Sequence, residues 1–424
     1  MATTIALHWA PTLTEGLPRR DRRGCDYESY LPDSLSNRVF LLDGDVAADV
    51  TDAEAAVQRL NIEATTLTGL EGLARLLLRA ESVASSKIEG LEIGGRRLLH
   101  AEVALELGEQ IQDVTAEEIL GNINAMAWAV ETLPAVDGIM VDNVLEIHRK
   151  LLAGTRLAEQ GGVLRTVQNW IGGGDYSPCE ADFVPPPPEQ VRRLLEDLCD
   201  FCNQSDLPAI VQAAIAHAQF ETIHPFVDGN GRTGRALIHV ILRRRGLAPR
   251  VLPPISLVLA TWSRDYINRL NGTRYLGTPD KPEAHQAINR WIGLFATAAR
   301  RSVDDARQFE ERVVAMLSAW RERLGRVRRG SAVELLIEAL PGAPVITVSS
   351  ASKIISRSFA ATNVAVNELV QSGILRQVRV GRRNRAFEAA EIIEAFNDLE
   401  RQLASPAGNT KVSAPTRAVP RRRR

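Results

Sequence analysis

The sequence predicts an all-α protein that carries one small β-hairpin. Apolar residues recur at helical spacing through most of the chain. In the central part of the chain, residues 167–171 and 182–184 are β-prone, with turn residues between them. A glycine-rich loop joins two helical stretches near the middle. The predicted helical stretches are 71–90, 119–130, 144–152, 210–218, 236–242 and 288–295.

Composition favours a multidomain protein without membrane spans. A length of 424 residues is enough for two or three domains. The 51 Lys and Arg residues balance the 52 Asp and Glu residues, so net charge does not steer the chain to nucleic acid. We find no leader and no apolar run approaching eighteen residues, and therefore expect a cytoplasmic protein. Four cysteines are too few for a disulfide scaffold, and Cys199 and Cys202 suit a buried helix better than a zinc site.

The central loop spans residues 224–235, with the letters HPFVDGNGRTGR. The backbone N–H groups of a glycine loop that opens a helix form an anion site. Gly229 and Gly231 let the backbone approach a phosphate, because no Cβ intervenes. The loop lacks the Lys-Ser/Thr pair of a P-loop and the oxygen ligands of a calcium loop. The remaining alternative is a plain corner between two helices.

The charged residues of this loop fit phosphate chemistry. Arg232 and Arg235 lie three apart on one side of the new helix, where both can contact phosphate oxygens. Asp228 is the only acid of the loop, and a single carboxylate beside a polyphosphate suits Mg²⁺. His224 precedes the loop as a candidate general base.

Residues 224–235 resemble, position by position, the Fic-family signature His-Pro-Phe-x-Asp-Gly-Asn-Gly-Arg-x-x-Arg. The resemblance implies a Fic-type helical core that moves AMP from ATP to a hydroxyl of a target protein. It implies that His224 deprotonates a Ser, Thr or Tyr hydroxyl and that Asp228 holds Mg²⁺. The implied anion hole consists of Gly229, Asn230 and Gly231, while Arg232 and Arg235 grip the β- and γ-phosphates. Phe226 would anchor the loop in the core.

An earlier stretch resembles the inhibitory motif of the same family. Ser85 and Glu89 lie four apart on the predicted helix 71–90, and Gly90 follows. Taken alone, this pattern is typical of a solvated helix end. Beside a Fic loop, the resemblance implies that Glu89 reaches Arg235 and occupies the place of the γ-phosphate.

Residues 165–188 resemble the flap of Fic proteins. The predicted hairpin pairs 167–171 with 182–184 across the turn at 172–175, and Pro185–Pro188 follow. An exposed strand edge can take a target segment by β-augmentation. We expect Ile171 and Val184 to pin that segment, and an ordinary surface loop is the alternative.

The last hundred residues have a different texture. Three helices and two strands around a basic turn at 381–385 resemble a winged helix-turn-helix over 331–400. Such a domain could bind DNA through its third helix and arginines, or it could dock proteins or form a homodimer. Residues 301–330 read as a connecting helix, and 401–424 as a disordered basic tail.

The whole chain then reads as an N-terminal extension over 1–100, a Fic core over 101–300 and the C-terminal parts. His148 lies among apolar neighbours, which favours a core histidine. We expect a protein adenylyltransferase that modifies a target protein, with self-modification as a further outcome. Three alternatives stay open: a hydrolase that removes AMP using Glu89, a DNA-binding regulator with a vestigial core, and transfer of another phosphate-containing group.

Overall fold

The computed structural model describes residues 1–11, 23–36, 38–63, 70–111, 113–174, 176–380 and 384–403. The predicted disordered tail beyond residue 403, the basic turn at 381–383 and Asp175 lie outside the described residues. The chain divides into two compact units. The first comprises residues 1–52, 128–245 and 264–297, and the second comprises 53–127, 246–263 and 298–424. The predicted domain borders remain predictions.

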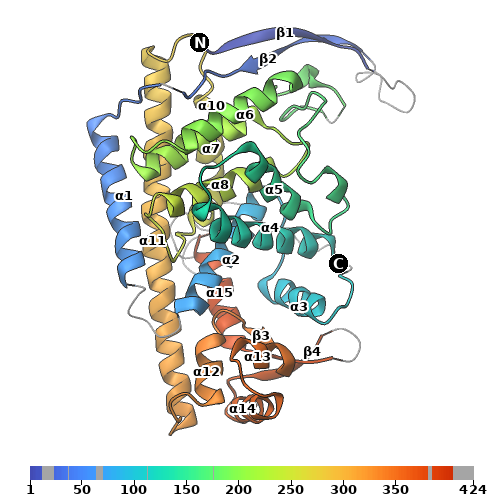
Figure 1. The fold of residues 1–424 in the computed structure, drawn as a ribbon, viewed down its shortest axis with the longest axis vertical. Coiled ribbons are helices and arrows are strands. Elements are labelled where there is room, and N and C mark those ends of the chain that lie inside the picture. The colour runs from blue at the N-terminus through green and yellow to red at the C-terminus, as the bar shows by residue number, and fades with distance from the viewer. Residues whose placement is uncertain are drawn as a thin grey trace, which may run out of the picture. The chain divides into compact units, whose positions relative to one another are not determined.

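Most of the first unit is helical, as the sequence predicts (Figure 1). Every residue of α7 (Ala209–Ile223) is buried, although its sequence mixes apolar residues with polar ones such as Gln212, His217 and Glu221. The α-helices of the first unit are α5 (Val141–Leu152), α6 (Pro188–Cys202), α7 (Ala209–Ile223), α8 (Asn230–Arg244) and α10 (Ser263–Gly272). It also has 3₁₀ turns at Leu133–Ala135, Ala158–Gln160 and Pro178–Glu180. Cys199 and Cys202 are buried free thiols on α6, which confirms the prediction for this pair.

A β-ribbon at the N-terminus was not predicted. β1 (Thr3–Trp9) pairs antiparallel with β2 (Cys25–Leu31), with Thr3 opposite Leu31. One end of the ribbon is held on both edges. The Ala2 N–H donates to the Gly277 carbonyl at 2.9 Å, and the Tyr30 N–H donates to the Val184 carbonyl at 2.9 Å. The ribbon is thus bound to the rest of its unit through backbone hydrogen bonds.

A disulfide joins this ribbon to the segment that precedes residue 181. It links Cys25 of β2 to Cys179, 154 positions away in the sequence. The sequence analysis did not predict this bond. Disulfides are rare in cytosolic proteins, so the bond lends no support to the predicted cytoplasmic location.

The second unit is built on α2 (Leu70–Ile88), α3 (Gly95–Glu106), α9 (Ile255–Thr261) and α15 (Ala390–Leu403). A buried carboxylate joins two of these helices. Glu81 of α2 accepts hydrogen bonds from the Ser256 N–H at 2.7 Å and from the Ser256 hydroxyl at 2.5 Å. Negative charge suits this position, because Ser256 lies in the first turn of α9.

The C-terminal part of this unit combines three helices with a three-stranded antiparallel sheet. Its elements are α12 (Ala332–Ala339), β3 (Val345–Ile346), α13 (Val348–Ile354), α14 (Phe359–Gln371), β4 (Arg376–Val380) and β5 (Asn384–Glu388). The strand order is β3-β5-β4. Ser331, Thr347 and Ser358 each cap a helix by accepting a backbone N–H, so the local sequence fixes where the helices begin.

Within the described residues, four helices contain residues of both units: α1 (Gly44–Glu63), α4 (Val114–Thr132), α10 by its first residue Ser263, and α11 (Pro282–Leu324). The predicted helices at 288–295 and 303–324 are one continuous α11 of 43 residues. Neither proline nor glycine interrupts the stretch between them, so no local signal ends the first. Among the described residues, no helix combines the length and the apolar character that crossing a bilayer requires.

His148 fixes α5 against the loop that follows α7. Its ring is 1% exposed and stacks on Phe226 at 3.7 Å between centroids. Nδ1 accepts the Gly162 N–H at 3.0 Å, so the proton on Nε2 is donated to the Asp228 carbonyl at 3.0 Å. Both ring nitrogens are satisfied, which confirms the predicted core histidine. Burial lowers the pKa of His148 to about 4, and the bond to Asp228 opposes that effect.

We expect the free energy of unfolding to fall as the pH drops from about 6.5 to about 4. In this window the unfolded chain takes up a proton on His148 that the folded protein resists, at a cost of about 3 kcal/mol. Urea midpoints measured from neutral pH to pH 4, for the wild type and for His148→Gln, check this. His217, whose pKa burial lowers to about 3, keeps part of the dependence in the variant. An identical pH dependence in both proteins would contradict the prediction.

Candidate active site

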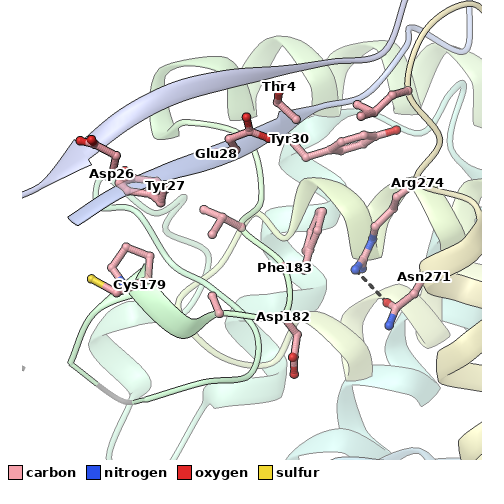
Figure 2. A pocket seen from close by; sticks show the side chains of 14 residues that line it. Thr4, Asp26, Tyr27, Glu28, Tyr30, Cys179, Asp182, Phe183, Asn271 and Arg274 are labelled. Carbon is pink, nitrogen blue, oxygen red and sulfur yellow. Dashed lines mark hydrogen bonds between the residues drawn. The ribbon is translucent and has the colours of Figure 1, made fainter. Parts of the chain in front are cut away.

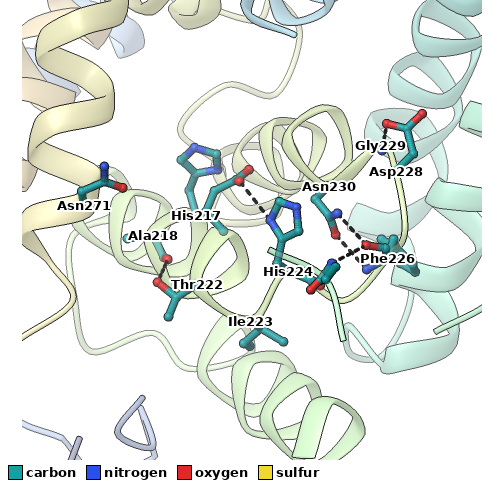
Figure 3. Close-up of polar contacts among 12 residues, drawn as sticks. His217, Ala218, Thr222, Ile223, His224, Phe226, Asp228, Gly229, Asn230 and Asn271 are labelled. Atoms are coloured by element: carbon teal, nitrogen blue, oxygen red, sulfur yellow. Dashed lines mark hydrogen bonds and ion pairs between the residues drawn. The ribbon is translucent and has the colours of Figure 1, made fainter. Parts of the chain in front are cut away.

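The loop between α7 and α8 begins and ends with left-handed backbone (Figure 3). His224 caps α7 with φ 49°, and Gly229 caps the start of α8 with φ 76°. A Cβ on Gly229 would lie 2.8 Å from the Leu151 Cδ2 atom, so only glycine fits there. A left-handed non-glycine residue is strained and is common at functional sites. The geometry places an imidazole where two helices meet.

Four side chains bind carbonyl groups of this loop, among them His148, which donates to the Asp228 carbonyl. Asn230 accepts the Phe226 N–H and donates to the Phe226 carbonyl, both at 2.8 Å. Asn169 donates to the carbonyls of Phe226 at 3.0 Å and His224 at 3.3 Å. Arg165 Nε donates to the His224 carbonyl at 2.9 Å. Neither Arg165 nor Asn169 was predicted from the sequence, although Arg165 lies just before the β-prone stretch.

The other predicted residues of the loop gather at the start of α8. Phe226 is fully buried, and Arg232 and Arg235 are only 2% and 1% exposed. The Asp228 carboxylate is half exposed, and its Oδ1 accepts the Gly229 N–H at 2.6 Å and an Arg232 N–H at 3.4 Å. Two buried guanidinium groups at a helix N-terminus make this region suited to an anion.

Asp228 has the chemistry to contribute one ligand to Mg²⁺. Within the described ranges, no cluster of three or more His, Cys, Asp or Glu residues could hold a metal ion. A Mg²⁺ ion at Asp228 would therefore take its other ligands from a polyphosphate and from water, as this ion commonly does. The half-exposed carboxylate beside an anion site fits that arrangement.

A second acidic residue lies beside His224. Glu221 occupies the last turn of α7, and its Oε2 atom lies 3.9 Å from Nδ1 of the imidazole. Both side chains are largely buried, with 9% of Glu221 and 19% of His224 exposed. The sequence analysis did not single out Glu221, because it precedes the signature.

The predicted hairpin is reduced to a single β-bridge. Ile171 pairs with Phe183: the Ile171 N–H donates to the Phe183 carbonyl at 2.8 Å, and the reverse bond measures 3.1 Å. Strands do not extend further, because Pro185–Pro188 have no N–H to donate. Val184 is buried, and its carbonyl already accepts the Tyr30 N–H of β2. Of the two predicted pinning residues, only Ile171 retains partial exposure.

A cavity of about 490 Å³ lies between β2 and this bridge (Figure 2). Arg274 reaches its wall with the guanidinium carbon 3.5 Å from the centre of the Phe183 ring. One of its nitrogens donates to the Asn271 amide oxygen at 2.8 Å. Burial lowers the pKa of Arg274 to about 10, and the nearby Glu221 carboxylate opposes that effect. Arg274 therefore packs on the Phe183 ring and interacts electrostatically with the Glu221 carboxylate.

The predicted inhibitory residues belong to the second unit. Ser85 is fully buried on α2, and Glu89 is exposed one residue beyond the end of that helix. The helix stops there because Gly90, with φ 84°, adopts the left-handed conformation typical of a helix C-terminus. The proposed contact between Glu89 and Arg235 stays a prediction.

Comparisons with known proteins agree with this geometry. Residues 138–242 match the model of the Fic/DOC family, and residues 47–131 match the model of the Fic/DOC family N-terminal region. A Fic family protein from Desulfovibrio desulfuricans G20 has a similar structure, with a TM-score of 0.51 and 20% sequence identity. That similarity covers 82% of this chain and 97% of the other, and shows a shared fold.

Two curated relatives are named protein adenylyltransferases. The protein fic-1 of Caenorhabditis elegans is 32% identical over 166 residues, which is 38% of this chain and 30% of that protein. The Fic protein of Drosophila melanogaster is 31% identical over 242 residues, which is 54% of this chain and 46% of that protein. The chain thus spans less than half the length of these relatives. From the family matches and the loop geometry, we conclude that this chain contains a Fic domain of the Fic/DOC family.

Proposed function

We propose that this protein transfers AMP from Mg–ATP to a Ser, Thr or Tyr hydroxyl of a target protein and releases pyrophosphate. The observation that carries the proposal is the loop 224–229, which places an imidazole at the start of a helix with two buried arginines. The names of the curated relatives support the same activity. The protein's own hydroxyls are a second class of acceptor.

In the proposed reaction, His224 removes the proton from the target hydroxyl as general base. The hydroxyl oxygen attacks the α-phosphorus, and the bond from that phosphorus to the bridging oxygen breaks. Pyrophosphate leaves with the bond electrons, and AMP remains on the target. The strained backbone at His224 fits this role, because it holds the imidazole at the mouth of the loop.

The anion-binding residues bind and orient the triphosphate. The amides of Asn230 and Gly231 lie in the first turn of α8, where helix N–H groups have no intrahelical acceptor. Gly229 precedes that turn, and its N–H would exchange the Asp228 carboxylate for phosphate. Arg232 and Arg235 supply two positive charges. Their burial makes these charges act more strongly on phosphate than they would in water. A bound Mg²⁺ would neutralise phosphate charge, and Asp228 is the residue that would hold it.

We place the target segment on the outer edge of residues 168–171. The Val184 side of the flap is already paired with Tyr30 of β2, whereas the Ile171 backbone bonds to Phe183 and accepts the Asp182 N–H on the same side. The backbone of Trp170 therefore faces the opposite way and offers an edge for β-augmentation. Asn169 connects this edge directly to the His224 carbonyl, so a segment docked there lies near the base.

We further propose that Glu89 inhibits the enzyme by pairing with Arg235, with Ser85 as part of the same motif. A carboxylate on that guanidinium would exclude the γ-phosphate and leave ATP in an unreactive pose. A charge-assisted hydrogen bond of this kind contributes about 1.5–3 kcal/mol, which suppresses the competent state about ten- to hundred-fold.

We expect His224→Ala to lower AMP transfer by at least about 100-fold, because the variant lacks the general base. The measurement is incorporation of label from α-labelled ATP, made in a Glu89→Gly background. The matched control is His8→Ala, which changes an exposed histidine of the β-ribbon. A residual rate close to that of the control would remove His224 from this role.

Replacing the inhibitory carboxylate should have the opposite effect. We expect Glu89→Gly to raise labelling from α-labelled ATP by about ten- to hundred-fold, because Arg235 becomes available to the γ-phosphate. Glu92→Gly, which changes an exposed acid three residues further on, serves as control. Equal labelling in the two variants would contradict the inhibitory assignment. Release of AMP from pre-modified protein by the wild type, but not by Glu89→Gly, would instead favour the hydrolase alternative.

The C-terminal elements fit a winged helix-turn-helix domain. We propose this assignment from three helices and the strand order β3-β5-β4, with β4 and β5 as the wing. Residues Phe359–Gln371 of the third helix include no Lys or Arg, so this helix offers no cation to DNA. Arg379 and Arg385 are exposed and lie opposite each other across the wing. Any DNA contact would then come from the wing and would be directed to phosphate.

A double reversal of charge tests the wing. We expect Arg379→Glu with Arg385→Glu to weaken duplex DNA binding and to reduce the slope of log affinity against log salt by about 2, because two phosphate contacts are lost. Gel shifts over a salt series measure both quantities. Wild-type protein that fails to shift a duplex at ~50 mM salt would exclude DNA as the partner and would favour protein docking.

A further inference from the structure

Glu221 lies outside the twelve-residue signature. It is the one acidic residue of α7, and it lies in the last turn before the catalytic loop. It precedes His224 by three positions, so both residues project from the same side of the last turn. Its Oε2 atom lies 3.9 Å from Nδ1 of His224, and the carboxylate is 9% exposed. A buried carboxylate is costly unless charged or polar groups surround it.

The residues around this carboxylate and the neighbouring imidazole come from three parts of the unit. On α8, a Cβ at Gly234 would lie 3.1 Å from the Glu221 Oε1 atom, so the glycine leaves room for it. From the end of α10 comes Arg274, the cation whose pKa the Glu221 charge raises against the effect of burial. Arg165 is the other cation near the imidazole, and its Nε binds the His224 carbonyl rather than the ring. The charged groups that the described contacts place here are Glu221 beside Nδ1 of His224, Arg165 at the His224 carbonyl, and Arg274, which acts on Glu221 through its charge.

We propose that Glu221 is a positioning residue for His224. Its carboxylate orients the imidazole through Nδ1, which leaves Nε2 to take the hydroxyl proton. It also stabilises the imidazolium that forms when Nε2 is protonated. This is the division of labour between a base and its orienting acid in other hydrolytic and transfer enzymes. Distances of this kind are often long before substrates bind and shorten in the reacting complex.

Arg274 connects this pair to the flap. Its guanidinium covers the Phe183 ring at 3.5 Å and lines the cavity beside β2 (Figure 2). Phe183 in turn forms the bridge with Ile171, the residue next to the proposed docking edge. Arg274 thus contributes positive charge near the orienting carboxylate, while its guanidinium packs on the flap.

A purely structural role is the competing explanation, since Glu221 also packs where α7 meets α8. The two roles differ in what a neutral isostere changes. Glu221→Gln keeps the volume and the ability to hydrogen-bond, whereas it removes the charge that favours the imidazolium. Glu221→Asp keeps the charge at a shorter reach. The exposed Glu196→Gln on α6 of the same unit is the matched control.

The inference rests on the proposed AMP transfer, so all variants are made in the Glu89→Gly protein. We expect Glu221→Gln to lower kcat about 10- to 100-fold with little change in the KM for ATP, and Glu221→Asp to restore part of that loss. The acid limb of the pH–rate profile should move to lower pH, because the neighbouring negative charge that favours the protonated ring is gone.

A second readout does not depend on activity. Histidine-labelled protein is titrated by NMR, and the His224 signal, one of seven histidines, is assigned with His224→Ala. Its titration midpoint should move to lower pH in Glu221→Gln and stay in place in Glu196→Gln. An unchanged midpoint together with an unchanged kcat would overturn the inference. Failure of the parent protein to transfer AMP, with the midpoint still shifted, would sink the proposed reaction and leave the pairing of Glu221 and His224 intact.

Discussion

The site depends on how the loop's carbonyl groups are bound. The Arg165 side chain donates to the His224 carbonyl, and its backbone N–H donates to the Pro225 carbonyl. Asn169 and Asn230 both donate to the Phe226 carbonyl. His148 takes the Asp228 carbonyl from the opposite side. When the acceptors of a tight loop are held in this way, the donors at the start of the next helix remain directed at the open side. The anion site therefore depends on the hydrogen bonds that hold the loop's carbonyl groups as well as on its glycines.

Arg232 and Arg235 of α8 are almost completely buried. A guanidinium group that is 1% or 2% exposed would be costly without negative charge close by. Arg232 is 3.4 Å from Asp228, but that carboxylate is itself half exposed and also holds the Gly229 N–H. Two buried guanidinium groups concentrate positive charge at this helix N-terminus, which suits a polyanion as ligand.

Local sequence patterns predicted the helices and the central loop well. Contacts between segments far apart in the sequence were not predicted. The loop 224–235 and the helices around it follow from glycine spacing and apolar periodicity. Arg165 binds a carbonyl 59 positions away, and Cys25 pairs across 154 positions, so neither has a local signature. The alternating pattern of Thr3–Trp9 was a usable signal for a strand. The predicted hairpin shrank to a bridge because the four prolines that follow cannot extend a ladder.

Rigid coupling between the flap and the base follows from one residue that reaches both. Arg165 donates to the His224 carbonyl at 2.9 Å and to the Pro186 carbonyl at 2.5 Å, so its planar fork spans the loop and the segment that closes the flap. Burial lowers the pKa of Arg165 to about 10, which leaves it charged at neutral pH. A charged, buried fork with several carbonyl partners loses little further freedom when a target docks. A small displacement of the flap would then be transmitted to the backbone of His224, where reactivity depends on ångström-scale placement.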